Sequence, residues 1–348
     1  MEKLFKVSSS PHIHDKDSIQ KIMLLVVISL LPALGGALYF FGLRALWVVA
    51  LTVASCVVTE AVIQKMRKKP VTVNDFSAVV TGMLLAYNVP AEVPLWMPVL
   101  GGVFAIAIAK QAFGGLGYNP VNPALAARAF MLASWPVNMT VFKTVPRGGT
   151  LSGTTVELFS GATPLNTMKQ AIDIVKHASE YVATPEKVVA ASKAIVEMKA
   201  AYGHLFWGNV GGCLGETSAF LLLLGAILLF ERRIISWRIP FTYIGTVALL
   251  SWVFGGPHGL FSGDPIFHIL AGGLILGAFF MATDMVTSPV TPRGQIYFGV
   301  GMGLLTVIIR LIGGYPEGVS YSILLMNLTV PLLDRFTRPK ILGESKKK

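Results

Sequence analysis

Long apolar runs separated by short polar clusters dominate this chain of 348 residues. A bilayer core requires about 20 apolar residues in helical form, with every backbone polar group satisfied within the segment, so such runs predict membrane-spanning helices. Seven runs are good candidates for full spans: 22–41, 45–63, 94–112, 237–254, 264–283, 297–312 and 319–333. Three shorter runs, bracketed by Gly, Pro or Asn, cover 76–89, 124–137 and 218–230. Short, interrupted segments of this kind are typical of broken helices that line a site.

Lysine and arginine alternate with these ten runs. If the N-terminus is in the interior, every second connection is interior as well. These interior connections carry basic residues: Lys65, Arg67, Lys68 and Lys69, then Lys110, then Arg232, Arg233 and Arg238, then Arg293. The basic C-terminal tail also lies in the interior. The four short exterior connections carry Arg44 and no other lysine or arginine. Basic residues concentrate in cytoplasmic loops, so the sequence predicts an all-α polytopic membrane protein of about ten transmembrane helices with both termini in the cytoplasm.

The predicted organisation has two membrane halves. A cytoplasmic tail (1–21) precedes five spans (22–137), an extracytoplasmic segment (138–205), five further spans (206–334) and a basic cytoplasmic tail (335–348). Two glycine-rich stretches, 75–118 and 264–316, resemble one another. This similarity is compatible with two inverted five-helix repeats, which in transporters place a site near the membrane midplane at their interface.

The composition agrees with a membrane protein and excludes several other classes. Hydrophobic residues make up 53% of the chain and charged residues 14%, against about 25% charged residues in soluble domains. The net charge of +11 lies in clusters between apolar runs, and not on a stripe that would favour nucleic acid. Cys56 and Cys213 are too few for a thiolate metal site or a disulfide framework, so we expect both to be buried as small apolar residues.

The extracytoplasmic segment contains the sequence Ser-Gly-Ala-Thr at 160–163, followed by helical patterns at 166–177 and 185–202. Thr163, with Pro164 at the first helical position and Thr167 one turn later, is typical of a helix N-cap. The start of a helix also attracts anions, because free backbone N–H groups and the positive end of the helix dipole face the ligand. Capping and phosphate binding are compatible at this position.

The residues Ser160, Gly161, Ala162 and Thr163 resemble the flavinylation motif of the RnfD/NqrB family. The stretches VSSSPH (7–12), GYNPVNPA (117–124) and TDMVTSP (283–289) are similar to other signatures of that family, so the resemblance covers nearly the whole chain. It implies that Thr163 carries FMN through a phosphoester bond made by a flavin transferase. The sequence departs from the motif at Glu157, where the family usually has aspartate.

Asn119 and Asn122 flank two prolines at the predicted cytoplasmic entrance of the short fifth span. One interpretation is a helix start, with Asn122 as N-cap and Pro123 at the first helical position. The other follows from the resemblance, because the same region of the family holds a noncovalent riboflavin. In that case the amides of Asn119 and Asn122 would hydrogen-bond the isoalloxazine edge.

Five ionisable residues lie in or near predicted spans: Arg128, Glu216, Asp264, Asp284 and Arg310. An ionisable group inside a membrane must be paired or face water, and is a functional candidate by default. Glu216 and Asp284 are at span ends, where they can face solvent. The sequence identifies no partner for Arg128 or Arg310, which fit an ion path, a contact with a partner subunit or a structural ion pair.

The resemblance implies an electron-transferring membrane subunit of a redox-driven Na⁺ or H⁺ pump in the inner membrane of a bacterium or archaeon. Length favours the RnfD branch, whose complex connects ferredoxin and NAD. The chain contains no GxGxxG motif and no CxxC cluster, so NAD and iron–sulfur groups would be held by partner subunits, beside further membrane subunits and a second covalent-FMN subunit. No catalytic or metal-binding residue is predicted. Two alternatives are an NqrB-type subunit of the Na⁺-translocating NADH:quinone oxidoreductase and a flavin-free channel or solute transporter.

Overall fold

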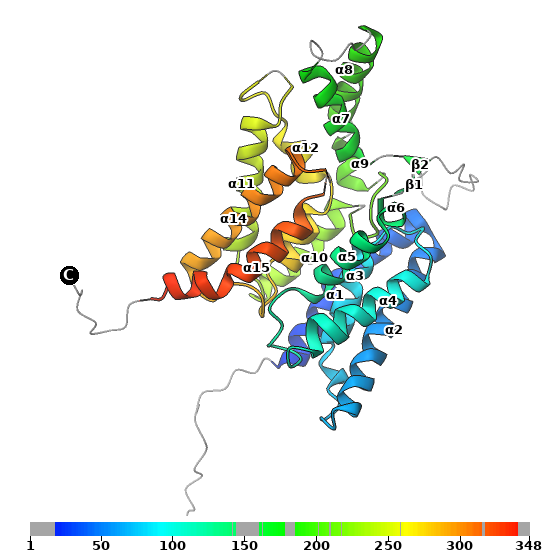
Figure 1. Cartoon of the computed structure of the whole chain (residues 1–348), viewed down its shortest axis with the longest axis vertical. Helices are drawn as coiled ribbons and strands as arrows, with labels where there is room; N and C mark the ends of the chain where they lie inside the picture. Colours follow the sequence, from blue (N-terminus) through cyan, green and yellow to red (C-terminus); the bar gives the residue numbers. More distant parts are fainter. Residues whose placement is uncertain are drawn as a thin grey trace, which may run out of the picture.

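A computed structural model describes residues 18–140, 142–143, 160–161, 163–177, 185–200, 202–208, 210–216, 218–257, 259–314 and 317–339. Helices account for nearly all of the secondary structure in these ranges, as the apolar pattern predicts (Figure 1). The N-terminal and C-terminal halves form two groups of helices that pack against each other, and a helical arm projects from one end of the molecule.

The first group of helices matches the five predicted N-terminal runs. It consists of α1 (Ile19–Phe41), α2 (Leu43–Met66), the short η1 (Val73–Asp75), α3 (Ser77–Tyr87), α4 (Trp96–Phe104) with its π-helical continuation η2 (Ala105–Gln111), and α5 (Pro123–Ser134). Gly42 alone separates α1 from α2 and has φ 69°. This left-handed conformation favours glycine and reverses the chain within one residue.

The second group matches the five predicted C-terminal runs, one of which is interrupted. It consists of α10 (Ala219–Glu231), α11 (Arg238–Phe254), α12 (Pro265–Leu270), α13 (Leu274–Leu276) with its π-helical continuation η4 (Gly277–Met281), α14 (Pro292–Leu311) and α15 (Val319–Phe336). The single run predicted at 264–283 is therefore two pieces, broken between Leu270 and Leu274. Gly272, with φ 73°, permits the break.

Close helix contacts join the two groups. Helix α1 packs against α10, and α5 packs against α15, while α11 packs against α14 within the second group. The approach of α1 to α10 depends on Gly225, because a Cβ atom there would lie 1.9 Å from the carbonyl oxygen of Ser29. Small residues permit such close contacts between helices in membranes. One apolar core, including Leu30, Leu85 and Phe298, extends through both groups.

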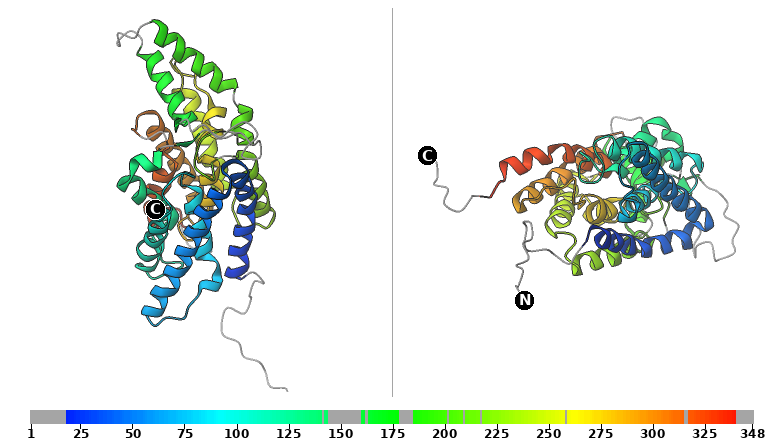
Figure 2. Two further views of the ribbon diagram at one scale, coloured as in Figure 1. Left: turned by 90° about the vertical axis from the view of Figure 1, so that its right-hand side faces the viewer. Right: turned by 90° about the horizontal axis from the view of Figure 1, so that it is seen from below.

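The arm is built from the segment between the two groups. It contains α6 (Pro136–Thr140), β1 (Phe142–Lys143), β2 (Ser160–Gly161), α7 (Pro164–Lys176), α8 (Pro185–Ala200) and α9 (Tyr202–Trp207). Helices α7 and α8 project beyond the helix groups in two perpendicular views (Figures 1 and 2). Leu165, Met168 and Ile195 form a small separate core with Phe267 of α12. This core anchors the arm to the second group.

Two helices predicted in the arm are confirmed as α7 and α8, whereas the β1–β2 ladder is not foreseen by the helical pattern. The ladder pairs Phe142 with Gly161 and Lys143 with Ser160 in antiparallel register. Two-residue strands give no alternating pattern that a sequence can reveal, and these two lie far apart in the chain.

Three helices of the described chain are long and apolar enough to cross a membrane: α1, α2 and α14. Shorter apolar helices include α3, α4 with η2, α5, α10 and α11. Large apolar side chains on these helices face outward, among them Trp47, Leu224 and Leu249. Apolar side chains exposed in this way on several helices need a lipid or protein cover. The helices are thus consistent with a multi-pass membrane protein.

Candidate functional site

Thr163 occupies the N-cap of α7, as predicted. Its Oγ1 accepts a hydrogen bond from the backbone N–H of Asn166 at 3.3 Å, and Pro164 is the first helical residue. The hydroxyl of Thr167 donates to the carbonyl oxygen of Thr163 at 3.2 Å. Thr163 is only 7% exposed. The position combines a hydroxyl oxygen with the start of a helix, where backbone N–H groups stabilise negative charge.

The residues before Thr163 are described only in part. Ser160 and Gly161 form β2, which pairs with β1 and so fixes the backbone just upstream of the cap. Glu157 and Ala162 lie outside the described residues. Of the predicted motif, the structure therefore describes the backbone of Ser160 and Gly161 and the whole of Thr163.

A cavity of about 20 Å³ adjoins Thr163 on the side of the helix groups. Thr163 and Gly272 line it together with two carboxylates, those of Glu216 and Glu317. Glu216 belongs to the segment that precedes α10. This segment is held against the end of α3 by a backbone hydrogen bond from the N–H of Gly215 to the carbonyl oxygen of Tyr87 at 2.8 Å. The two halves of the chain thus meet beside the cap of α7.

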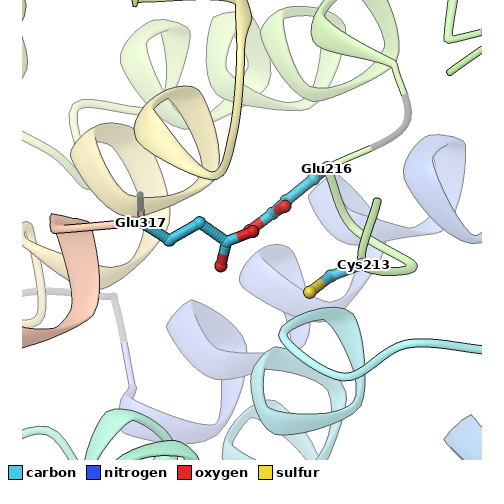
Figure 3. Close-up of side chains that lie close together, drawn as sticks. All are labelled: Cys213, Glu216 and Glu317. Carbon is cyan, nitrogen blue, oxygen red and sulfur yellow. The ribbon is translucent and has the colours of Figure 1, made fainter. Parts of the chain in front are cut away.

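Arg128 of α5 pairs with both carboxylates, which Figure 3 shows directed toward each other from different segments of the chain. Its Nη2 forms an ion pair with Glu317 and lies 3.7 Å from Oε1 of Glu216. Its Nη1 donates to Oδ1 of Asn88 at 3.0 Å and to the hydroxyl of Ser320. The sequence identifies no partner for Arg128 and allows Glu216 to face solvent. The structure corrects both points, since Glu216 is 8% exposed and Arg128 5% exposed.

Arg310 of α14 is directed to the break between α12 and α13. Its guanidinium donates to the carbonyl oxygens of His268 and Ala271, at the C-terminal end of α12. A cation at the end of a helix satisfies carbonyl groups that have no partner within the helix and interacts favourably with the dipole. Arg310 therefore stabilises the broken helix. It forms no ion pair within the described residues.

Asp264 lies at the other end of α12. Its Oδ1 accepts from the N–H of Phe267 at 3.0 Å, so it is the N-cap of this helix. Its Oδ2 accepts a hydrogen bond from the phenol of Tyr202 in α9. The last of the five ionisable residues, Asp284, accepts from the hydroxyl of Thr287 at 3.0 Å. These contacts give both aspartates local structural roles.

A second cavity, of about 90 Å³, is lined by both Asn119 and Asn122. Asn122 is the N-cap of α5, as one of the two interpretations predicts: its Oδ1 accepts from the N–H groups of Ala124 and Leu125 at 3.0 and 3.3 Å. Its Nδ2 donates to the carbonyl oxygen of Met281 in η4 at 3.3 Å. Asn122 thus has at most one amide hydrogen left for a ligand.

The side chain of Asn119 makes fewer hydrogen bonds than that of Asn122 within the described residues. Its Nδ2 donates to the carbonyl oxygen of Val121 at 3.2 Å, which leaves its side-chain oxygen as an acceptor beside the cavity. The rings of Phe279 and Phe280 and the carboxylate of Asp284 also line the cavity. Apolar walls with a few polar groups are typical of small-molecule sites.

Sequence reasoning misses a buried ion pair on the wall of this second cavity. The charge pattern assigns Lys110 to an interior connection, but the residue lies in η2, with its Nζ 2.8 Å from Oε1 of Glu60 in α2. It also donates to the hydroxyl of Ser77 at 2.6 Å, and Gln111 donates to Glu60 at 2.8 Å. The signal is present in the sequence, because Glu60 and Lys110 interrupt apolar runs where ionisable residues are rare.

The chain is similar over almost its whole length to known membrane subunits. A profile of the NQR2, RnfD, RnfE family matches residues 6–343. A relative from Acetobacterium woodii, the D subunit of the Na⁺-translocating ferredoxin:NAD⁺ oxidoreductase complex, is 52% identical over 98% of this chain and 96% of its own. The proton-translocating counterpart from Clostridium ljungdahlii is 45% identical over the same shares.

A third relative, the D subunit of the ion-translocating oxidoreductase complex of Citrobacter koseri, is 38% identical over 98% of this chain and 99% of its own. The profile match and these three relatives each cover nearly the whole chain. The chain belongs to the NQR2, RnfD, RnfE family.

Proposed function

We propose that this chain is the D subunit of an ion-translocating ferredoxin:NAD⁺ oxidoreductase, the Rnf complex. Three relatives that align end to end with it are D subunits of ion-translocating oxidoreductases, two of them named for ferredoxin and NAD⁺. One of these two is named for Na⁺ and the other for protons, so the relatives do not decide the cation. Other subunits of the complex would hold the NAD and iron–sulfur sites, because this sequence has no motif for either.

The proposed membrane arrangement has ten segments in two inverted halves. Helices α1, α2, α3, α4 with η2, and α5 would correspond in order to α10, α11, the interrupted α12–α13–η4, α14 and α15. The packing supports this correspondence, because α2 contacts α3 and α4 as α11 contacts α12 and α14. The α5–α15 contact then relates equivalent helices across the halves. With both termini in the cytoplasm, α7 to α9 would lie outside.

We propose that Thr163 carries FMN as a phosphoester. The observation that supports this most directly is the position of its hydroxyl oxygen at the N-cap of α7, where a covalently attached phosphate would meet the positive end of a helix. The residues present fit the group at this level, because they provide an oxygen nucleophile and helix N–H donors between β2 and α7. Bound flavin supplies one-electron transfer chemistry.

The cavity at Asn119 supports the proposal of a second, noncovalent flavin, riboflavin. The side-chain oxygen of Asn119, which has no hydrogen-bond partner within the described residues, would accept from the flavin ring, and Phe279 and Phe280 provide aromatic walls. Asn122 would contribute through the amide hydrogen that does not bond Met281. Its other role, as the cap of α5, holds the loop that carries Asn119.

Covalent attachment is tested by expressing the full chain with a flavin transferase and examining it on a denaturing gel. We expect the wild type to fluoresce and Thr163→Ala to lose the fluorescent band while still inserting in the membrane. Thr167→Ala is the matched control, because its hydroxyl lies one turn along the same helix and bonds the backbone of Thr163. Intact mass should show one FMN on the wild type and on the control only.

An unchanged fluorescent band in Thr163→Ala would exclude this residue as the acceptor. A colourless wild type, matured with an active transferase, would exclude the flavin-carrying function and favour a flavin-free membrane subunit. Both outcomes are readable without measuring the activity of the complex.

A further inference from the structure

A groove of about 630 Å³ lies where α10 and η4 end and where α11 and α14 begin. Its walls are the connection from α10 to α11, the connection from η4 to α14 and the first turns of α11 and α14. The volume lies within the range of about 300–1,000 Å³ that is typical of small-molecule sites. Because α10, α11 and α14 are apolar helices, their ends should meet the surface of the membrane. The groove therefore opens at that surface.

The charge of the groove is positive. Arg233 and Arg238 line it, and none of its described lining residues is acidic. The structure gives neither guanidinium an acidic partner among the residues that it describes. The N-terminal end of α11 also borders the groove, so the positive end of the helix dipole adds to the two charges. The groove therefore favours an anion.

The other walls of the groove are apolar. Trp237, Met285 and Val290 line it and are exposed. From Trp237 an apolar face continues along α11 through the exposed Phe241 and the half-buried Ile244. These positions are four and seven residues after Trp237, so they lie on the same face of the helix. Tryptophan is enriched at membrane–water interfaces, which agrees with the position of the groove at the membrane surface.

Basic and apolar walls side by side select the class of ligand. The guanidinium of Arg238 lies over the ring of Trp237, with its Cζ 5.6 Å from the ring centroid, so the basic and apolar walls adjoin. An anionic phospholipid fits both walls, because it joins a phosphate to acyl chains. A soluble phosphate would use the basic wall and leave Trp237 and Met285 in water. A zwitterionic headgroup would bring a cation toward two guanidiniums that have no acidic partner in the groove.

We propose that this groove binds the headgroup of one anionic phospholipid of the phosphatidylglycerol class. Arg233 and Arg238 would donate hydrogen bonds to the phosphate oxygens, and an acyl chain would lie along the face of α11 that carries Phe241. The proposal requires these helices to cross a membrane and is independent of both proposed flavins. If the termini are cytoplasmic, as proposed above, the lipid belongs to the inner leaflet.

The test measures lipid binding to the purified full-length chain in a neutral detergent by native mass spectrometry. The probes are dioctanoyl phosphatidylglycerol, dioctanoyl phosphatidylcholine and inorganic phosphate. We expect one saturable site for phosphatidylglycerol and binding of the other two probes that is weaker by about tenfold or more. Arg233→Gln and Arg238→Gln should each weaken phosphatidylglycerol binding by about fivefold, which is the effect of one basic residue near an anionic lipid.

Arg232→Gln is the matched control. Arg232 is the exposed neighbour of Arg233 and does not line the groove. Its replacement removes the same charge from the same turn, so phosphatidylglycerol binding should stay as in the wild type. The thermal unfolding midpoint of each variant shows whether it is folded.

Four results would overturn the proposal, and two of them need only the wild type. These two are equal affinities for phosphatidylglycerol and phosphatidylcholine, and an inorganic phosphate affinity as high as that for the lipid, which would assign the groove to a soluble anion. Equal weakening by Arg232→Gln and Arg233→Gln would show a diffuse basic surface in place of a site. The fourth result is an Arg233→Gln chain that binds the lipid as the wild type does but no longer assembles with the other subunits, which would assign the groove to a protein partner.

Discussion

Replacing Arg128 tests whether the buried charge cluster is a single coupled unit. Arg128→Met removes the guanidinium that pairs with Glu317, lies 3.7 Å from Glu216 and bonds Asn88 and Ser320. Breaking a buried ion pair from one side typically costs about 3–5 kcal/mol, because the remaining charge has no compensation. Two carboxylates remain here, so we expect a loss in the upper part of that range.

A second substitution should restore part of this stability. Glu317→Gln in the Arg128→Met background removes one of the two stranded charges, and we expect it to recover at least about 1 kcal/mol, as coupled neighbours commonly do. The same change in the wild-type background should destabilise, since it takes a charge from the partner of Arg128. The opposite signs of the two effects are the signature of coupling.

The assay is reversible unfolding of the full chain by titrating a denaturing detergent, with tryptophan fluorescence as the signal. The control is Lys193→Met, which breaks a surface pair whose side chains are 76% and 64% exposed. Exposed pairs of this kind contribute about 0.2–1 kcal/mol. Two results would refute the reasoning. One is that Arg128→Met lowers the free energy of unfolding no more than the control does. The other is that the effects of Arg128→Met and Glu317→Gln on this free energy are additive.

Three further predictions concern packing, the second cavity and the arm. Gly225→Ala should cost about 1–3 kcal/mol, since its Cβ would lie 1.9 Å from a backbone oxygen of α1. Gly245→Ala, with no atom within 4 Å of its Cβ, should not destabilise in the same unfolding assay. Lys110→Met should cost about 3–5 kcal/mol by stranding Glu60, and Glu60→Gln should recover part of it; additive losses would contradict the pairing. Burial and the neighbouring carboxylate raise the pKa of Tyr202, so its stabilising contribution is complete below the ordinary tyrosine pKa of about 10 and is lost as pH rises through the raised value. Tyr202→Phe should therefore flatten the alkaline part of a stability-against-pH profile, and an unchanged slope would contradict this.

Local features of the fold could be predicted from the sequence because their causes are local. The caps at Thr163 and Asn122 follow from the residue type and the proline that comes next, and both are confirmed. The arm helices follow from their amphipathic patterns, and the burial of Cys56 and Cys213 is confirmed, although Cys213 lies beside charged side chains. Each of these inferences depends on neighbours within about one helical turn.

The charge pairs could not be predicted because they join distant parts of the chain. Arg128 and Glu317 are 189 residues apart, and Lys110 and Glu60 are 50 residues apart. A sequence shows that such residues interrupt apolar runs, yet their partners depend on which helices pack together. The break at Gly272 is similar: the sequence predicts one continuous span over 264–283, and the guanidinium of Arg310 that stabilises the break comes from another helix.

If Thr163 carries FMN as proposed, the burial of this residue restricts when a flavin transferase can reach its hydroxyl. An enzyme must surround the hydroxyl it esterifies, yet in the described residues this oxygen is already engaged at the start of α7, and Leu165 of the same helix is packed into the small core shared with α12. Under this proposal, attachment would be a step of biogenesis that precedes the docking of α7, or would require the helix to undock briefly. A mature subunit would then retain the same covalently bound flavin and could not exchange it for another.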